Sequence, residues 1–203
     1  MSLDEIAREI SNCRKCQLWA TKTRYVPGEG SEKAEVVFVG EAPGREEDKQ
    51  GRPFVGNAGK LLTEMIENVL GLSRKDVFIA NVLKCRPPNN RDPLPEEINA
   101  CSPYLIRQLE AIRPEVIVCL GRFSASFIFE LLNIPFPGIS KVRGRVFEAQ
   151  MDSRKVKVMA TYHPAAILYK PQLREIFEGD FKTIASLLRE RKANPTLLDF
   201  MDS

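Results

Sequence analysis

The sequence predicts a three-layer α/β/α fold, in which helices cover both faces of a central, mainly parallel sheet of four strands. Two observations lead to this expectation. Apolar runs rich in Val, Ile and Phe recur at four places, and amphipathic helical patterns separate them. Such alternation is typical of strand–helix–strand units, whose parallel strands are buried on both faces. The length of 203 residues is enough for one well-filled domain.

The four predicted strands share one pattern, which is a short apolar run that stops abruptly at a polar or turn residue. They are residues 35–40, 76–81, 114–121 and 156–163. A less apolar stretch, 141–150, predicts an extra strand or hairpin arm beside this sheet.

The predicted helices are stretches whose apolar residues recur at helical spacing, and they fall between and after the strands. They are residues 57–71, 95–113, 122–133 and 172–191. Each predicted helix that separates two strands provides the crossover that neighbouring parallel strands require.

Composition and charge limit the classes of function. The net charge of +3, from 30 basic and 27 acidic residues, permits a nucleic-acid partner without requiring one. No apolar run approaches the roughly 18 residues of a membrane span, so a membrane partner is not expected. The N-terminal stretch "MSLDEIAREISNC" carries acids and lacks the apolar core of an export signal. We therefore expect a cytoplasmic protein that acts as a monomer.

Polar side chains stand at three of the four predicted strand ends. They are Glu41, Asn81 and His163, and a turn-rich segment just after Glu41 carries Phe54. In sheets of this kind, binding sites gather beyond the carboxyl ends of the strands. The sequence thus predicts one site that combines a carboxylate, an amide, an imidazole and an aromatic ring.

The cysteines indicate a metal centre. Five of them in a reducing compartment argue against a disulfide framework. Cys13 and Cys16 form a C-x-x-C pair, Cys85 follows a predicted strand, and Cys101 lies on the next predicted helix. Four such residues can ligate zinc or an iron–sulfur cluster, and their spacing leaves both open, as well as four buried free thiols. Cys119, inside a predicted strand, is expected to be a small buried apolar residue.

Four motifs together resemble the family 4 uracil-DNA glycosylases, the iron–sulfur enzymes of bacteria and archaea. The motifs are "GEAPGREED", "GRPFVG", "NVLKCRPPNNR" and the late "HPA", and the likeness runs from about residue 3 to 190. One departure is Asn57, where many members of the family are expected to have a basic residue.

The resemblance implies a function and a cofactor. It implies a monofunctional DNA glycosylase that hydrolyses the N-glycosidic bond of deoxyuridine in single- or double-stranded DNA, releases uracil and leaves an abasic site. It also implies a 4Fe–4S cluster on Cys13, Cys16, Cys85 and Cys101, in place of zinc. We expect this cluster to be structural, because hydrolysis transfers no electrons.

Glu41 and His163 are the expected catalytic residues. Glycosidic cleavage develops positive charge on the sugar and negative charge on the departing base. Glu41 supplies an anion near the sugar and can orient or deprotonate the attacking water. His163 is the only histidine, and as a donor to uracil O2 it would stabilise the leaving group. Three further acids on the same loop, Glu46, Glu47 and Asp48, are competitors for this role, although a solvated acidic turn is the expected explanation for all three.

The remaining expected contacts recognise the base. Phe54 would stack on the flipped ring, although a loop Phe is also often a small core anchor. The Asn81 amide can accept from uracil N3–H and donate to O4, a pattern that cytosine reverses. Backbone groups from Gly40 to Ala42 would complete the pocket, since Gly40 lets the base approach closely.

Extraction of the base from a duplex requires a wedge. The stretch "HPAAILYKP" offers Ile167, Leu168 and Tyr169 beside a lysine, and Leu168 is the expected intercalating residue. The alternative is a short helix that buries these side chains. Basic residues that could contact phosphates form four groups, although each alone is as well explained by a solvated face. The groups are Arg14/Lys15, Lys84/Arg86, Arg143/Arg145 and Arg154/Lys155/Lys157.

Three rival functions stay open at this stage. The first is a protein that binds or covalently traps uracil-containing DNA, and the covalent-trapping branch uses a histidine outside the HPA motif, which this chain lacks. The second is a glycosylase with a broader choice of deaminated bases, against which Glu41 argues. The third is a zinc-containing nucleotide-binding protein.

The C-terminal tail, residues 194–203, is expected to stand apart from a single catalytic domain of residues 1–193. Pro195 ends the preceding basic helix. Leu197, Phe200 and Met201 follow at spacings that one helical turn would place on one face. The pattern is similar to the short peptides with which repair enzymes bind the sliding clamp, so a clamp is a candidate partner. The alternative is a tail that folds back onto its own domain.

Overall fold

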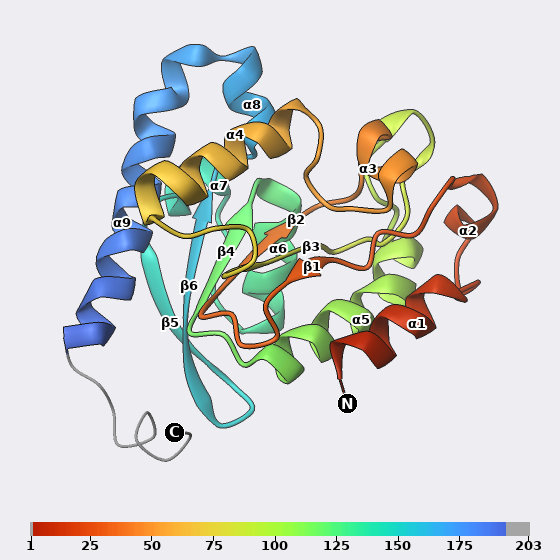
Figure 1. Ribbon diagram of the computed structural model, residues 1–203, viewed down its shortest axis with the longest axis horizontal. Coiled ribbons are helices and arrows are strands. Elements are labelled where there is room, and N and C mark those ends of the chain that lie inside the picture. Colours follow the sequence, from red (N-terminus) through yellow and green to blue (C-terminus); the bar gives the residue numbers. More distant parts are fainter. Residues whose placement is uncertain (1, 194–203) are drawn as a thin grey trace.

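The computed structural model describes residues 2–193, with side chains to residue 190, and its centre is one sheet. The strand order is β1-β3-β2-β4-β6-β5. The four inner strands pair in parallel, and the edge strands β1 and β5 pair antiparallel with their neighbours. The strands are β1 (Glu29–Gly30), β2 (Val36–Gly40), β3 (Phe78–Asn81), β4 (Val116–Leu120), β5 (Val146–Met151) and β6 (Arg154–Thr161). Figure 1 shows the sheet between its two helical layers.

The expected α/β/α class is confirmed, and the strand count of four is corrected to six. The parallel centre consists of the four predicted strands. The stretch expected to be an extra strand or hairpin arm forms β5, an antiparallel arm on β6. The edge strand β1 was not predicted, because two residues that pair with Ile79 and Phe78 carry no periodicity to detect.

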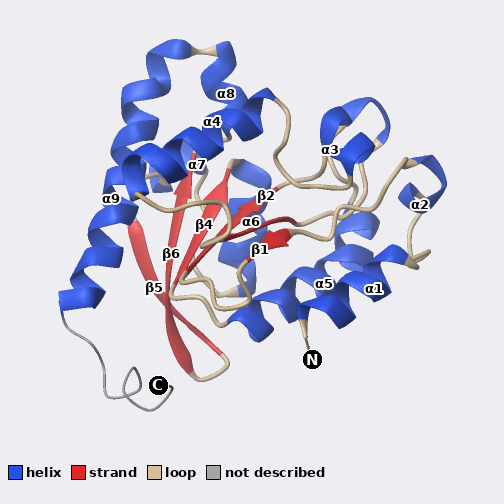
Figure 2. Cartoon of the chain, in the orientation of Figure 1, coloured by secondary structure: helices blue, strands red, loops and turns tan. Residues whose placement is uncertain are grey.

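The helices lie where the sequence predicts them, with additions and with ends that differ by one to several residues. The described helices of six residues or more are α1 (Leu3–Ser11), α3 (Arg45–Gln50), α4 (Asn57–Met65), α5 (Pro95–Ile112), α6 (Arg122–Leu131), α8 (Pro164–Tyr169) and α9 (Arg174–Ala193). The shorter helical segments are α2 (Leu18–Thr21), α7 (Ile139–Val142), the π-helical turn η1 (Ile66–Leu70) and the 3₁₀ turns η2 (Pro88–Asn90) and η3 (Pro171–Leu173). Figure 2 distinguishes these helices from the loops that join them to the strands.

Helix α1 begins at a capping box that was not predicted. The Ser2 side chain accepts from the amide of Glu5, and the Glu5 carboxylate accepts from the amide of Ser2. This exchange satisfies two amides that a helix start leaves without partners. Leu3, Ile6 and Ile10 then face the core, and α1 packs against α5.

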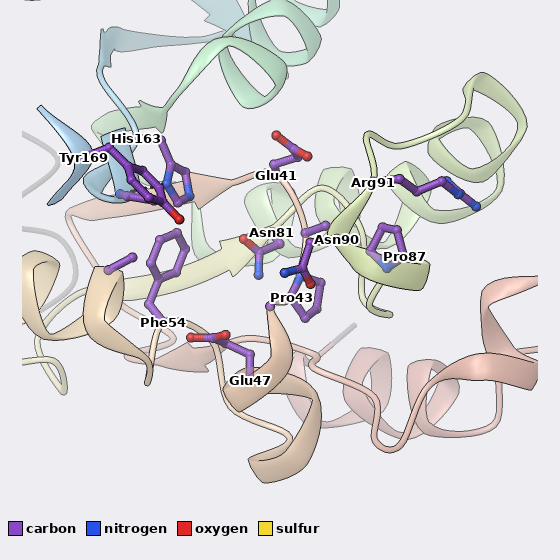
Figure 3. A pocket seen from close by; sticks show the side chains of 14 residues that line it. Glu41, Pro43, Glu47, Phe54, Asn81, Pro87, Asn90, Arg91, His163 and Tyr169 are labelled. Carbon is purple, nitrogen blue, oxygen red and sulfur yellow. Dashed lines mark hydrogen bonds between the residues drawn. The ribbon is translucent and has the colours of Figure 1, made fainter. Parts of the chain in front are cut away.

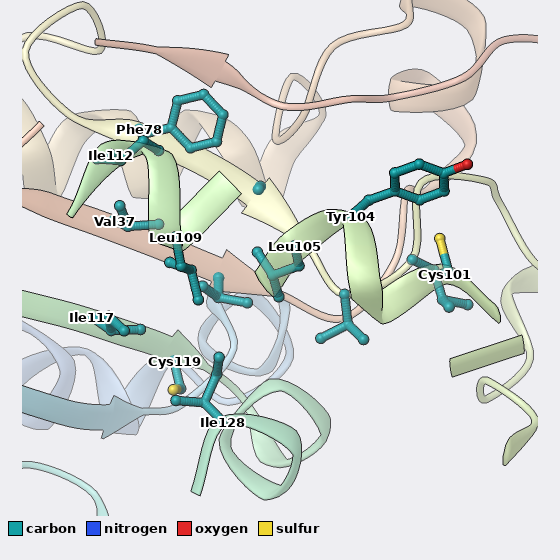
Figure 4. Packing of buried hydrophobic residues seen from close by; sticks show 14 of the residues in the cluster. Val37, Phe78, Cys101, Tyr104, Leu105, Leu109, Ile112, Ile117, Cys119 and Ile128 are labelled. Carbon is teal, nitrogen blue, oxygen red and sulfur yellow. The ribbon is translucent and has the colours of Figure 1, made fainter. Parts of the chain in front are cut away.

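The core has two parts, one on each face of the sheet. Side chains alternate along each inner strand, so that Val37 and Val39 face one part while Val36 and Phe38 face the other. Helices α1, α5 and α6 cover the first part, and α4, α8 and α9 cover the second. Cys119 is fully buried in the first part, as expected, and Figure 4 shows it beside Ile128.

The structure bears on a membrane span and on the C-terminal tail to different extents. Among the described residues, no helix is long and apolar enough to cross a membrane. The tail residues Leu197, Phe200 and Met201 lie outside the described part of the chain.

Candidate active site

A cavity of about 430 Å³ opens beyond the carboxyl ends of the inner strands. Glu41 follows β2, Asn81 ends β3, and His163 lies two residues beyond β6. The structure brings these three residues together with Phe54 around one hollow, as Figure 3 shows. Ala42 also lines the cavity, while Gly40 lies directly behind Phe54 and Asn81.

Glu41 is a half-buried carboxyl group whose pKa is raised to about 7. Burial is the main cause, because it disfavours the charged form. The nearby charge of Asp92 raises the pKa further, and Arg122 opposes both effects. At neutral pH the group therefore exchanges protons readily, as a general base requires.

His163 is neutral at physiological pH, because burial lowers its pKa to about 4, while Glu47 exerts a smaller opposite effect. Its Nδ1 accepts the amide N–H of Ala165 at 3.1 Å, a bond that also caps α8. A neutral imidazole that accepts at Nδ1 carries its proton on Nε2. The ring is therefore a hydrogen-bond donor at Nε2.

Phe54 and Gly40 are packed so closely that each depends on the other. The Phe54 ring is buried, and its centroid lies 5.6 Å from that of His163. A Cβ atom on Gly40 would lie 2.6 Å from the Phe54 ring and 2.3 Å from Asn81 Oδ1. The glycine is thus required by these two side chains, whereas its predicted role was close approach of the base.

Asn81 holds a buried acceptor without a partner. Only 2% of the residue is exposed, and Oδ1 is the one buried side-chain N or O atom of the described residues that has no hydrogen bond. Leaving such an atom without a partner costs about 1–3 kcal/mol. The atom belongs to a residue that lines the cavity, so a donor that enters there can satisfy it.

The expected solvated acidic turn is wrong for two of its three members. Residues 45–50 form the short helix α3. Glu47 points back and accepts the amides of Val55 and Gly56 at 2.8 Å each. Asp48 is buried and accepts the amides of Thr23 and Arg24. Both carboxylates hold neighbouring loops in place, and only Glu46 lies on the surface, paired with a lysine.

Several lining residues were not predicted. Pro87, Asn90 and Arg91 form the wall opposite His163, and Tyr169 lies beside that histidine (Figure 3). Asn90 has a positive φ of 53° and accepts from Arg86 through its side chain. The run "PPNN" indicates only a turn, and nothing in its composition shows that the turn folds over the strand ends.

The expected wedge segment is the short helix α8, with unequal exposure of its apolar residues. Ile167 is buried, whereas Leu168 is 49% exposed and Tyr169 is 86% exposed. One expected phosphate contact is wrong, because Lys84 is fully buried. Its ammonium group donates to the carbonyl of Asn81 at 2.8 Å and to Gln108 Oε1 at 2.7 Å.

The four candidate metal ligands line one small apolar pocket. Cys13 and Cys16 approach it from the N-terminal segment, and Cys85 and Cys101 from the segment after β3 and from α5. Desolvation raises the pKa of the Cys101 thiol to about 11, and the amide of Lys84 donates to its Sγ at 3.2 Å. Among the described residues, no three His, Cys, Asp or Glu side chains form a group able to hold a metal ion.

Several known proteins that resemble this chain are named uracil-DNA glycosylases. Residues 27–187 match the uracil DNA glycosylase superfamily. The type-4 uracil-DNA glycosylase of Archaeoglobus fulgidus is 64% identical over 98% of this chain and 99% of that protein. That of Sulfurisphaera tokodaii is 57% identical over 92% of this chain and 84% of that protein. The type-4 enzyme of Thermotoga maritima is 42% identical over 93% of this chain and 95% of that protein.

Proposed function

Since the chain belongs to the uracil DNA glycosylase superfamily and, within it, to the type-4 enzymes, we propose that its cavity releases uracil from DNA by hydrolysis. It is a DNA glycosylase, and its products are free uracil and an abasic site. The observation that carries the assignment of the cavity is the buried, unpartnered Oδ1 of Asn81 beside Phe54 and His163.

Recognition of the base uses the Asn81 amide and the Phe54 ring. Oδ1 accepts uracil N3–H, and the Asn81 amide nitrogen donates to uracil O4. Cytosine would instead bring its N3 lone pair against Oδ1 and its N4 amino group against the Asn81 amide nitrogen. Such a mismatch in a buried site costs several kcal/mol in favourable cases. Phe54 stacks on the ring, a contact worth about 1–3 kcal/mol.

Bond cleavage uses Glu41 and His163. The C1′–N1 bond breaks and its electron pair leaves with uracil, whose O2 accepts a hydrogen bond from His163 Nε2–H. Glu41 faces the positive sugar as a carboxylate, orients water and takes its proton as the new C1′–O bond forms. A neutral imidazole suits the role of His163 because the uracil anion develops only in the transition state.

The direct test is an assay on an oligonucleotide that contains a single uracil, followed by alkali. We expect strand cleavage at the uracil position and none in the matched thymine oligonucleotide. Intact strands after long incubation at high enzyme concentration would contradict the proposal.

We further propose that Cys13, Cys16, Cys85 and Cys101 hold a 4Fe–4S cluster. Four thiols around one apolar pocket suit a cluster, which spaces its ligands more widely than one ion does. When bound, the cluster would supply structural cross-links and no electrons for the reaction. Iron and acid-labile sulfide analysis with a visible spectrum checks this, and zinc in place of iron would overturn it.

Leu168 and Tyr169 are the proposed contacts with the gap that a flipped base leaves. Both are exposed on α8, and Tyr169 also lines the cavity. Leu168 stays the proposed intercalating residue. Single- and double-stranded substrates distinguish this role, because Leu168→Ala should slow cleavage in a duplex more than in a single strand. Equal effects on both would remove Leu168 from base extraction.

Binding of a sliding clamp by residues 194–203 remains a proposal that rests on sequence alone. Titration of the host's clamp against the full chain and a version that ends at Ala193 tests it. Loss of binding confined to the truncation, with glycosylase activity intact, would support it. Identical behaviour of the two versions would exclude it. Size-exclusion chromatography of the full chain tests the proposed monomeric state.

A further inference from the structure

Arg74, which lies outside the uracil cavity in the turn before β3, binds the backbone of the Phe54 loop directly. One guanidinium nitrogen donates to the carbonyl of Phe54 at 3.0 Å, and another donates to that of Pro53 at 2.7 Å. Only 16% of the Arg74 side chain is exposed. The planar fork of arginine thus holds two consecutive carbonyls, a geometry that a lysine ammonium does not reproduce.

The Phe54 loop has a conformation that needs such support. Phe54 has a positive φ of 51°, which bulky residues adopt rarely and which persists only where the surroundings hold it. A Cβ atom on Gly59 would lie 1.9 Å from the Phe54 carbonyl oxygen, so α4 presses closely against that same group. On the other side, Glu47 accepts the amides of Val55 and Gly56.

The same guanidinium group of Arg74 also binds the edge of the sheet. Arg74 Nε and a terminal nitrogen donate to Glu29 Oε1 at 3.0 and 2.5 Å, and Glu29 lies on β1. Burial opposes ionisation of Glu29, but hydrogen bonds from Arg52 and Arg74 hold its pKa below the ordinary value. Arg52 shares this carboxylate, yet it is 57% exposed, and within the described part of the chain it donates hydrogen bonds to Glu29 alone.

We propose that Arg74 is a positioning residue for the base-stacking ring, and that it fixes the Phe54 loop to strand β1 through Glu29. It acts through Phe54 and touches no reacting atom. The inference therefore rests on the proposed role of Phe54 as the platform for uracil. The edge strand β1, although only two residues long, would then serve as the anchor of the active-site loop.

A double-mutant cycle tests the inference, with Arg52→Gln as the matched control that removes an arginine from the same carboxylate. Single-turnover uracil release is measured for the wild type, Arg74→Gln, Arg52→Gln, Phe54→Leu and the Phe54→Leu/Arg74→Gln double variant. We expect Arg74→Gln to raise the enzyme concentration for half-maximal rate about tenfold, and Arg52→Gln to change it less than about twofold. In the Phe54→Leu background, Arg74→Gln should add less than about twofold.

Equal losses from Arg74→Gln in both backgrounds, or equal losses from the two arginine variants, would overturn the proposal. Should Arg74→Gln fail to fold, Arg74→Lys serves the same cycle, because it keeps a charge near Glu29 but lacks the fork.

Hydrogen exchange gives a readout that does not require activity. The amides of Val55 and Gly56 should exchange about tenfold faster in Arg74→Gln than in the wild type, and at an unchanged rate in Arg52→Gln. If the wild type released no uracil, the proposed function would fall while this comparison still decided whether Arg74 holds the loop. Unchanged exchange in Arg74→Gln would overturn the inference even in an active enzyme.

Discussion

At the scale of single residues, Glu41 ties the reaction to pH. If its carboxylate form is the active one, kcat/KM should rise about tenfold per pH unit below about 7 and level off above it. Below its raised pKa the Glu41 carboxyl is mostly protonated, so activity is lost as the pH falls. A pH profile of the wild type measures this, and Glu41→Gln should abolish the dependence together with most of the rate.

Two surface substitutions test whether the inflection of the pH profile belongs to Glu41, because they should move it in opposite directions. Asp92→Asn removes a negative charge and should move the inflection to lower pH, whereas Arg122→Gln should move it to higher pH. The two side chains pair at 2.9 Å and are largely exposed, so both displacements should shrink as salt is added. An inflection that moves in the same direction in both variants would assign the pH dependence to another group.

Asn81 should determine the choice of base. Asn81→Asp places a carboxylate where the amide donates to uracil O4, so we expect slower uracil release and a uracil-over-cytosine ratio at least about tenfold lower. Rates on matched uracil and cytosine oligonucleotides measure the ratio. An unchanged preference would remove Asn81 from recognition.

The residues at the strand ends could be predicted, because parallel strands deliver their last residues to one edge of the sheet. This applies to Glu41, Asn81 and His163, which do meet at one cavity. The part played by Glu47 could not be predicted. Its carboxylate binds amides eight and nine residues away, and no local pattern fixes the path of the loop between them.

At the scale of elements, the segment after β3 depends on a buried charge. Lys84→Met would leave Gln108 Oε1 and the carbonyl of Asn81 without their buried donor, so we expect a loss of about 2–4 kcal/mol in the free energy of unfolding. Denaturant titration measures it. Lys33→Met, at an exposed position, is the control and should change stability by less than about 0.5 kcal/mol. Equal stability of the two variants would show that the buried bonds contribute little.

Long periodic elements were predicted well and short ones were not. Helices α5 and α9 and the inner strands repeat their apolar spacing often enough to be detected. Helix α3 is a six-residue acidic segment whose folding depends on contacts made by Glu47 and Asp48 elsewhere in the chain. Ser2 and Glu5 form the Ser-x-x-Glu pattern that is typical of a capping box, so the start of α1 is encoded locally in the sequence.

At the scale of the whole molecule, the two faces of the sheet carry different tasks. Phe54 and Ile167 belong to the core part covered by α4, α8 and α9. The cysteine pocket lies at the edge of the opposite part, where Cys85 and Cys101 pack in the core and Cys13 and Cys16 pack against it. A metal centre there would join the N-terminal segment to α5, since its ligands come from both.

Removal of the proposed cluster should therefore loosen one face of the molecule and leave the other unchanged. After chelation, or in Cys13→Ala, we expect faster hydrogen exchange at residues 12–28, while the amides of β2 and β4 stay protected. Cys119→Ala is the control, because that thiol is buried away from the pocket: it should keep its iron and its visible absorption while losing about 1 kcal/mol of stability. Exchange that rises over the entire sheet in Cys13→Ala would mean that the centre supports both faces. Exchange that is unchanged everywhere, with iron lost, would mean that packing of α1 on α5 alone holds the N-terminal segment.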